Sequence, residues 1–196
     1  MTRGPNTQFD TEVALSKAME VFWAHGYEAA SLSELLKSMG IGKKSLYDTF
    51  GNKHSLFLKA LDYYARTTIR DIRDRLNADG SPLTNLKHLL REWQQMHSQS
   101  GSCGCMLGTN IADFNTDDEA IANIMRVYLQ QAEDAFTTTL KRAQAAGELS
   151  SNADPRNIAR LLLCTTQGMA LLGRVMDNNT TLEGAVEVTI SFIEGN

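Results

Sequence analysis

The sequence "MGIGKKSLYDTFGNKHSLF", residues 39–57, places a short lysine-containing segment between glycines. Its spacing predicts a helix from Lys43 to Phe50, ended by Gly51, because glycine readily adopts the left-handed conformation that stops many helices. Lys43 and Lys44 occupy the first turn of this helix. Free backbone amides and the helix dipole already attract anions at that end. The segment therefore indicates a site for phosphate groups.

The ten residues before it, "SLSELLKSMG", predict a second short helix. Ser31 is an N-cap, Glu34 follows at the capping-box spacing, and Gly40 ends the helix. Two short helices joined by a glycine-containing turn form a helix-turn-helix, here over residues 31–50, whose second helix lies in the DNA major groove. An ordinary helical corner with exposed lysines would give the same pattern, so the motif by itself leaves both interpretations open.

The remainder of the chain also carries helix signals. Residues 10–26 have an apolar stripe at helical spacing, and a fourth helix continues to Leu76. A helix of about seven turns ends at Gly147, and the last two helices are expected at about 155–175 and 183–194. The segment "AVEVTISFI" alternates like a strand, but no second strand candidate exists to pair with it, so we expect a helix.

These patterns predict an all-α chain with two domains. A flexible arm covers residues 1–9, and a three-helix DNA-binding domain covers 10–56. A helical bundle for ligand binding and dimerisation covers 57–196. Residues 1–76 hold 11 Lys and Arg against 9 Asp and Glu, whereas residues 77–196 hold 8 against 14. A mildly basic first part on an acidic second part is consistent with a nucleic-acid partner.

Composition narrows the class of protein further. The chain has 196 residues, of which 42% are hydrophobic, enough for a sizeable core. No apolar run approaches the length of a membrane span, and the first residues lack the apolar core of a signal peptide. Three cysteines do not form a disulfide framework. We therefore expect a cytoplasmic protein with reduced thiols and no membrane partner.

The stretch "FWAHGYEAASLSELLKSMGIGKKSLYDTFGNKHSLF", residues 22–57, resembles the N-terminal domain of TetR-family (tetracycline-repressor-like) transcriptional regulators. The matching residues are Phe22, Gly26, Tyr27, Ser31, Leu35, Gly40, Ile41, Ser45, Leu46, Tyr47, Phe50, Lys53 and Leu56. The resemblance implies an obligate dimer whose C-terminal domain binds a small molecule and releases operator DNA. The stretch "GCMLGTNIADF" resembles one branch of the family.

Three positions depart from the family pattern. Gly42 stands where Ser or Thr is usual, Lys44 replaces a frequent Gly, and Asp48 replaces a frequent aromatic residue. Because these positions face DNA in the family, the operator sequence does not follow from the resemblance.

The expected DNA contacts divide by role. Groove contacts are assigned to Lys43, Lys44 and Ser45, next to the backbone of Gly42. Phosphate contacts are assigned to Ser31, Tyr47, Lys53 and His54. Arg3 in the arm either reaches the minor groove or has no role.

A regulator also needs an input, and the bundle is the expected place for an effector pocket. The candidate lining combines apolar bulk with rare polar groups: Trp93, Met96, His97, Cys105, Met106, Asn110, Phe114, Tyr128, Gln131, Gln167 and Met169. For any single Met or aromatic residue, core packing is the simpler interpretation. The amides are more informative, because a polar group among apolar neighbours needs a partner.

The last helices are expected to form the dimer, through Leu161, Cys164, Gly168, Leu171, Leu172, Val186, Ile190 and Ile193. The expected function is that of a repressor that binds a palindromic operator as a homodimer and is released by a small-molecule effector. No cofactor, resident metal or catalytic residue is expected.

Two other functions remain open. Cys103 and Cys105 with His97 could make the same fold a thiol- or metal-responsive sensor, although inert packing cysteines are the simpler interpretation. A helical-bundle enzyme is a remote alternative, because the sequence contains no assembled catalytic motif.

Overall fold

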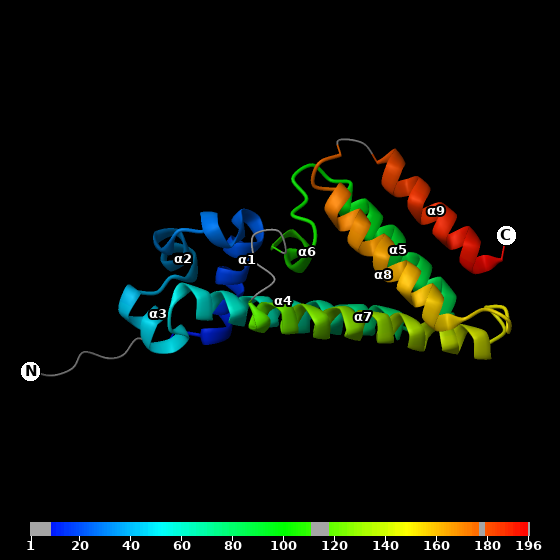
Figure 1. Ribbon diagram of the computed structural model, residues 1–196, viewed down its shortest axis with the longest axis horizontal. Coiled ribbons are helices and arrows are strands. Elements are labelled where there is room, and N and C mark those ends of the chain that lie inside the picture. The colour runs from blue at the N-terminus through cyan, green and yellow to red at the C-terminus, as the bar shows by residue number, and fades with distance from the viewer. Residues whose placement is uncertain (1–8, 111–117, 177–178, 196) are drawn as a thin grey trace, which may run out of the picture. The chain divides into compact units, whose positions relative to one another are not determined.

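The computed structural model describes residues 9–110, 118–176 and 179–195, and within them it is built from α-helices without a strand (Figure 1). The helices are α1 Thr11–Ala29, α2 Leu32–Met39, α3 Lys43–Phe50, α4 Lys53–Leu76, α5 Pro82–His97, α6 Met106–Asn110, α7 Glu119–Ala145, α8 Pro155–Leu172 and α9 Thr180–Glu194. The all-α prediction is confirmed. None of these helices is long and apolar enough to cross a membrane.

The chain divides into two compact units, residues 1–64 and 65–196, and the division falls inside α4. The sequence placed the boundary earlier, after Leu56. The difference has a physical reason, because the first turns of α4 supply core residues to the first unit. Phe57, Ala60 and Leu61 are fully buried, and the ring of Phe57 lies 5.0 Å from that of Phe22.

Local signals explain the helices of the first unit. Asp10 caps α1 by accepting from the backbone N–H groups of Glu12 and Val13 at 2.9 and 3.1 Å. Ser38 on α2 donates to the carbonyl of Lys17 on α1 at 3.4 Å, and so ties the first two helices together. Leu35 on α2 is fully buried, as an apolar residue facing the core should be.

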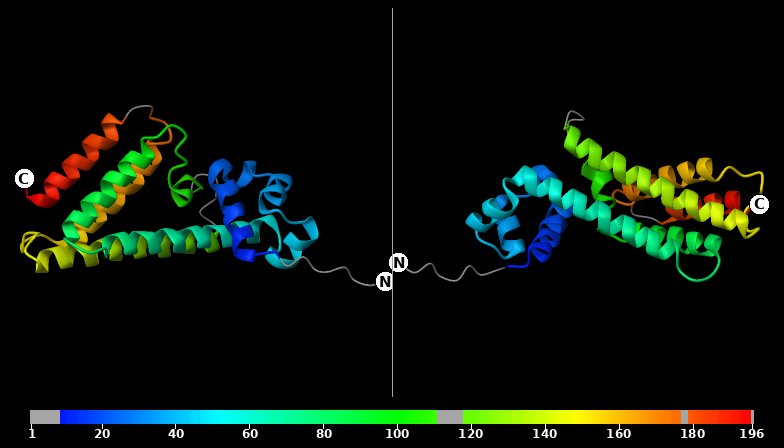
Figure 2. Two further views of the ribbon diagram at one scale, coloured as in Figure 1. Left: turned by 180° about the vertical axis from the view of Figure 1, so that it is seen from behind. Right: turned by 90° about the horizontal axis from the view of Figure 1, so that it is seen from below.

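The second unit is a bundle in which α8 packs against α5, α6, α7 and α9. Figures 1 and 2 show α9 running alongside α5 and α8. Ion pairs hold these helices: Lys87 with Glu194 at 2.6 Å, and Arg156 with Glu133 at 2.8 Å. Hydrogen bonding to Arg156 lowers the pKa of Glu133. The carboxylate of Glu148 accepts from the start of α5, at the Ser81 hydroxyl and the Leu83 amide.

Helix α9 confirms that "AVEVTISFI" is helical, but it corrects the assignment of the dimer face. Val186, Ile190 and Ile193 are at most 3% exposed, because they pack into the core of their own subunit. The exposed apolar residues of α9 are instead Val188 and Phe192, at 71% and 59%. On α8, the predicted residues Leu161, Cys164, Leu171 and Leu172 are exposed, and Gly168 is half-buried.

Candidate nucleic-acid interface

The turn between α2 and α3 has the geometry that the sequence predicts. The hydroxyl of Ser31 accepts from the amide of Glu34 at 3.2 Å and caps α2. Gly40 ends α2 with φ of 67°, in the left-handed region that favours glycine. Immediately afterwards the amide of Ile41 donates to the carbonyl of Leu36 at 3.3 Å, which closes the turn.

Helix α3 has one buried and one exposed face. Leu46 is fully buried and Phe50 is 3% exposed, so these two residues fix the helix on the domain core. Lys43, Lys44 and Tyr47 lie on the exposed side. The two lysines lie in the first turn of α3, where the sequence analysis places them, and Ser45 is half-buried beside them.

The N-terminus of α3 is left without a side-chain cap, because Gly42 has no side chain to provide one. The first backbone amides of the helix consequently need an acceptor from water or from a bound anion. Since positive charge from Lys43 and Lys44 lies in the same turn, this end of α3 is suited to a phosphate group.

Lys44 has a partner that the sequence analysis missed. Its ammonium lies 2.7 Å from the carboxylate of Asp48, one turn further along α3. The hydrogen bond to Asp48 and the charge of that carboxylate raise the pKa of Lys44. The sequence does indicate this ion pair, because Lys44 and Asp48 stand at the i, i+4 spacing of interacting side chains on a helix.

Lys53 is held in place at the start of α4. Its ammonium lies 4.6 Å from the centre of the Tyr27 ring, and it donates to the carbonyl of Glu28 at 3.4 Å. The ring of Tyr27 also faces that of His54 at 6.3 Å. Tyr27 therefore contacts two of the four predicted phosphate contacts, Lys53 and His54, and its distance in sequence from Lys53 concealed this role. Arg3 lies outside the described residues.

Three predicted effector contacts come together in the second unit, from segments far apart in sequence. The hydroxyl of Tyr128 on α7 interacts with Cys105 and with Gln167 on α8. Burial and Cys105 raise the pKa of Tyr128, whereas the hydrogen bond with Gln167 lowers it. A methyl group built on Gly108 would lie 3.4 Å from the Gln167 amide oxygen and 3.8 Å from the Cys105 Cβ. Gly108 thus belongs to the same cluster, which we call the tyrosine cluster.

The other candidate effector residues are spread through the bundle. Trp93 packs against Phe136 at 6.4 Å between ring centres. Met106 and Met169 are buried, Gln131 is half-buried, and Met96 is 45% exposed. Phe114 and the side chain of Asn110 lie outside the described residues.

His97 is 6% exposed, and its Nδ1 lies 3.3 Å from the hydroxyl of Ser102. Burial lowers the pKa of His97, so the ring is neutral near pH 7. Cys103 is half-buried, Cys105 is buried and Cys164 is exposed. In the part of the chain that the structure describes, no three His, Cys, Asp or Glu side chains form a group that could hold a metal ion.

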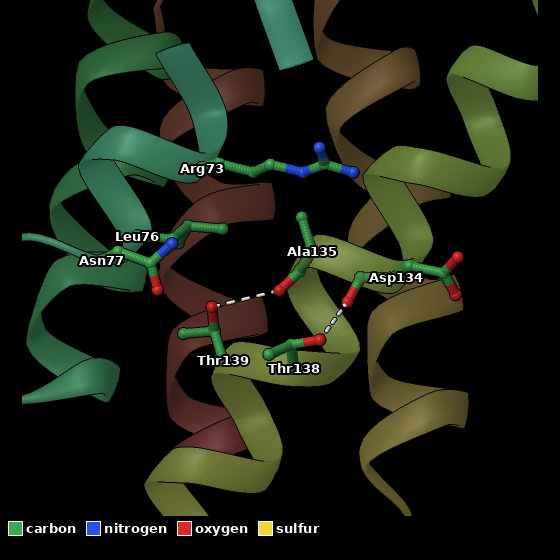
Figure 3. A pocket seen from close by; sticks show the side chains of 7 residues that line it. All are labelled: Arg73, Leu76, Asn77, Asp134, Ala135, Thr138 and Thr139. Atoms are coloured by element: carbon green, nitrogen blue, oxygen red, sulfur yellow. Dashed lines mark hydrogen bonds between the residues drawn. The ribbon is translucent and has the colours of Figure 1, made fainter. Parts of the chain in front are cut away.

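Two hollows in the second unit lie apart from the tyrosine cluster. One, of about 160 Å³, is lined by residues of α4 and α7 and by Asn77 directly after α4: Arg73, Leu76, Asn77, Asp134, Ala135, Thr138 and Thr139 (Figure 3). Thr138 and Thr139 donate their hydroxyl hydrogens to backbone carbonyls of their own helix, as the dashed lines show. The other, of about 330 Å³, is largely apolar and includes Leu161 and Phe192. None of the predicted effector residues lines either hollow.

Comparison with known proteins agrees with this arrangement over most of the chain. Residues 14–60 match the model of the bacterial regulatory proteins of the tetR family, and residues 82–189 match that of the tetracyclin repressor-like C-terminal domain. YezE of Bacillus subtilis (strain 168), named as an uncharacterized HTH-type transcriptional regulator, is 31% identical over 193 residues, which cover 97% of this chain and 100% of the relative. The HTH-type transcriptional repressor ComR of Escherichia coli (strain K12) is 30% identical over 175 residues, 88% of this chain and 83% of ComR.

A solved structure extends the similarity to a DNA complex. A cysteine mutant of the TetR family transcriptional regulator CifR, bound to double-strand operator DNA of 26 bp, superimposes with a TM-score of 0.81 at 28% identity. The match covers 95% of this chain and 98% of that chain. With a helix-turn-helix unit, a helical second unit and relatives that match up to 97% of its length, the chain belongs to the TetR family of transcriptional regulators.

Proposed function

We propose that the protein is a repressor that binds a palindromic operator as a homodimer through α3 and releases it when an effector occupies the second unit. The single observation that carries the DNA contact is the exposed N-terminus of α3. It combines uncapped amides with Lys43 and Lys44 on a helix that Leu46 anchors to the core. Two such helices in a two-fold dimer contact half-sites roughly 34–36 Å apart, or a multiple of that spacing.

The position of each side chain assigns it a different role in DNA binding. Lys53 and Tyr47 are proposed to hold phosphates. Lys53 lies at the start of α4, and Tyr47 lies on the exposed side of α3 but beyond its first turn. Lys44 is proposed to face base edges, because its side chain is 90% exposed at the second position of α3. Phosphate contacts fix position, whereas base contacts select the sequence.

The test is the affinity of labelled operator, recovered from random double-stranded DNA, measured over a range of salt concentrations. Lys53→Ala and Tyr47→Phe should weaken binding to every sequence, and Lys53→Ala should reduce the salt slope by about 0.9. Lys44→Ala should change the preferred operator. Lys141→Ala, on the exposed side of α7, is the matched control and should leave the affinity, the salt slope and the preferred operator unchanged. Unchanged affinity, slope and preference in all three variants would overturn the assignment of α3.

The tyrosine cluster is the proposed effector site. Tyr128 and Gln167 place hydrogen-bonding groups inside a largely apolar bundle, which suits a small ligand that is mostly apolar with a few polar atoms. Effector binding and operator binding would then oppose each other through one conformational equilibrium.

A library of small molecules can be screened for release of labelled operator. Active compounds should lose potency against Tyr128→Phe and Gln167→Leu, with Gln130→Ala on the exposed side of α7 as control. Equal potency against all three variants would place the effector elsewhere.

A thiol-responsive sensor is the second candidate, and one observation favours Cys105 over Cys103 for it. Cys105 interacts with the Tyr128 hydroxyl inside the proposed effector site, whereas the sulfur of Cys103 lies 3.9 Å from the carbonyl of Gly101. If Cys105 is the sensor, hydrogen peroxide or N-ethylmaleimide should release operator from the native protein and from Cys164→Ser, but not from Cys105→Ser. Release from all three would exclude Cys105.

A further inference from the structure

The DNA-facing side of α3 carries two opposite charges one helical turn apart. The Lys44 ammonium and the Asp48 carboxylate lie 2.7 Å from each other, and their side chains are 90% and 63% exposed. An ammonium and a carboxylate in contact present hydrogen-bond donors next to a hydrogen-bond acceptor. This pair extends from the anchored helix into the space that the operator would occupy.

Helix stability does not account for the pair. Lys44 stands at the second position of α3, where the helix dipole disfavours a cation, and Asp48 stands in the last turn, where it disfavours an anion. Helix α3 has no acidic residue in its first turn and no basic residue in its last. The favourable order at this spacing has the acidic residue first. Exposed ion pairs also contribute little to folding in general.

DNA affinity alone does not account for Asp48 either. A carboxylate at this surface repels phosphates and therefore weakens binding to DNA of any sequence. It becomes favourable only where it accepts a hydrogen bond from a base. In the major groove the available donors are the amino groups of cytosine and adenine.

We infer that Lys44 and Asp48 together recognise one G·C base pair in each operator half-site, which deepens the proposed function of α3 and rests on it. Lys44 donates to N7 and O6 of guanine, and Asp48 accepts from N4 of cytosine. A G·C pair presents acceptor, acceptor and donor in that order across the major groove. The Lys44–Asp48 pair presents the complementary order, donors followed by an acceptor.

The same geometry rejects the other base pairs. An A·T pair presents acceptor, donor and acceptor. Either Lys44 then faces the amino donor of adenine, or Asp48 faces the O4 acceptor of thymine. A C·G pair in the opposite orientation reverses the order and places the ammonium opposite the cytosine amino group. The contact therefore fixes both the composition and the orientation of the base pair.

The first experiment replaces each base pair of the selected operator in turn and measures affinity for the native protein and for Asp48→Ala. At one G·C position per half-site, replacement by A·T should weaken native binding about tenfold. Asp48→Ala should lose the part of that preference that comes from cytosine, keep the part that Lys44 reads from guanine, and bind unrelated DNA more tightly than the native protein does. The exposed residue Asp79, in the turn after α4, supplies the control: Asp79→Ala removes the same charge and should keep the preference.

Modified bases test the contacts at single atoms. N4-methylcytosine removes the groove-facing donor, and 7-deazaguanine removes the N7 acceptor. Each should weaken the native protein at the same base pair. Asp48→Ala should become insensitive to N4-methylcytosine, and Lys44→Ala should become insensitive to 7-deazaguanine. Asp48→Asn keeps an acceptor oxygen without the charge, so it should retain part of the cytosine preference.

The outcomes separate this inference from the proposed function. If the native protein selects a palindrome but Asp48→Ala has the same base preferences at every position, the inference is overturned while the function of α3 stands. If the native protein selects no sequence, the proposed function itself fails. Circular dichroism of each variant verifies folding, which should be unchanged because both side chains are exposed.

Discussion

The two compact units build their sites in different ways. In the first unit, the proposed DNA-binding surface comes from α3, eight consecutive residues whose start, end and exposed face follow from neighbours in the sequence. In the second unit, the tyrosine cluster joins Cys105, Tyr128 and Gln167, which come from three separate segments. A site made from one helix is specified locally, whereas a site made from several depends on how the bundle packs. This difference predicts how each unit responds to substitution.

The largest effect is expected from the aromatic core of the first unit. Phe57 is fully buried and lies 5.0 Å from both the Phe22 and the Tyr27 rings, so Phe57→Ala should cost about 3–5 kcal/mol of unfolding free energy. Phe57 packs against Tyr27, and Tyr27 contacts Lys53, so Phe57→Ala should also abolish operator binding. Urea unfolding and operator affinity measure the two effects. Phe136→Ala in the second unit should cost a similar amount, while its folded fraction keeps operator affinity. Native operator affinity in Phe57→Ala would contradict this division of roles.

A smaller loss is expected where the second unit depends on close backbone packing. A Cβ on Gly173 would lie 2.3 Å from the carbonyl oxygen of His97, closer than real Cβ atoms approach. Gly173→Ala should therefore destabilise the protein by about 1–3 kcal/mol, measured by thermal or urea unfolding. Gly184 on α9 is the matched control, because nothing lies within 4 Å of its added Cβ. Gly184→Ala should be neutral or stabilising, and equal losses in both variants would refute the packing argument.

His97 should make the stability of the second unit depend on pH. Burial lowers its pKa in the folded state, so the unfolded chain takes up a proton first as the pH falls below the ordinary value of 6.5. Stability should therefore be highest above that pH and decrease through the acid side of it. His97→Asn can keep a polar contact with Ser102 but does not titrate. Its melting temperature should fall less than that of the native protein between about pH 7.5 and pH 5.5; an identical fall would show that His97 is not responsible.

The smallest effect is expected at the uncapped start of α3. Serine at position 42 can accept from the free amides, so Gly42→Ser should stabilise the protein by only a few tenths of a kcal/mol. The serine hydroxyl also adds a group that can contact a phosphate, so operator affinity should rise modestly. Comparison of melting temperature and operator affinity with the native protein measures both. A loss of affinity would contradict the expected contact between the serine hydroxyl and a phosphate.

The sequence predicted what depends on neighbours along the chain. The bounds of α3, the Ser31 cap and the end of α2 at Gly40 were all predicted, because caps and glycines act within a few residues. The helical state of residues 185–193 followed from the absence of a strand to pair with.

Features that need the packed structure were missed or misplaced. The contact between Tyr27 and Lys53 joins the end of α1 to the start of α4, and no local pattern marks it. Val186, Ile190 and Ile193 were assigned to a dimer face, because an apolar stripe does not say whether its own subunit or a partner covers it. The sequence analysis named Cys105, Tyr128 and Gln167 among the candidate effector residues but did not group them. The sequence does not give the distances between helices.

The most direct test of the account is a selection of random double-stranded DNA, run in parallel with the native protein and with Lys43→Ala/Lys44→Ala. The native protein should enrich a palindrome whose half-sites are about one helical turn apart, or a multiple, and binding should weaken steeply with salt. The double variant should enrich no such sequence while remaining folded. The same palindrome from both proteins, or none from the native protein, would contradict the claim that α3 recognises the operator.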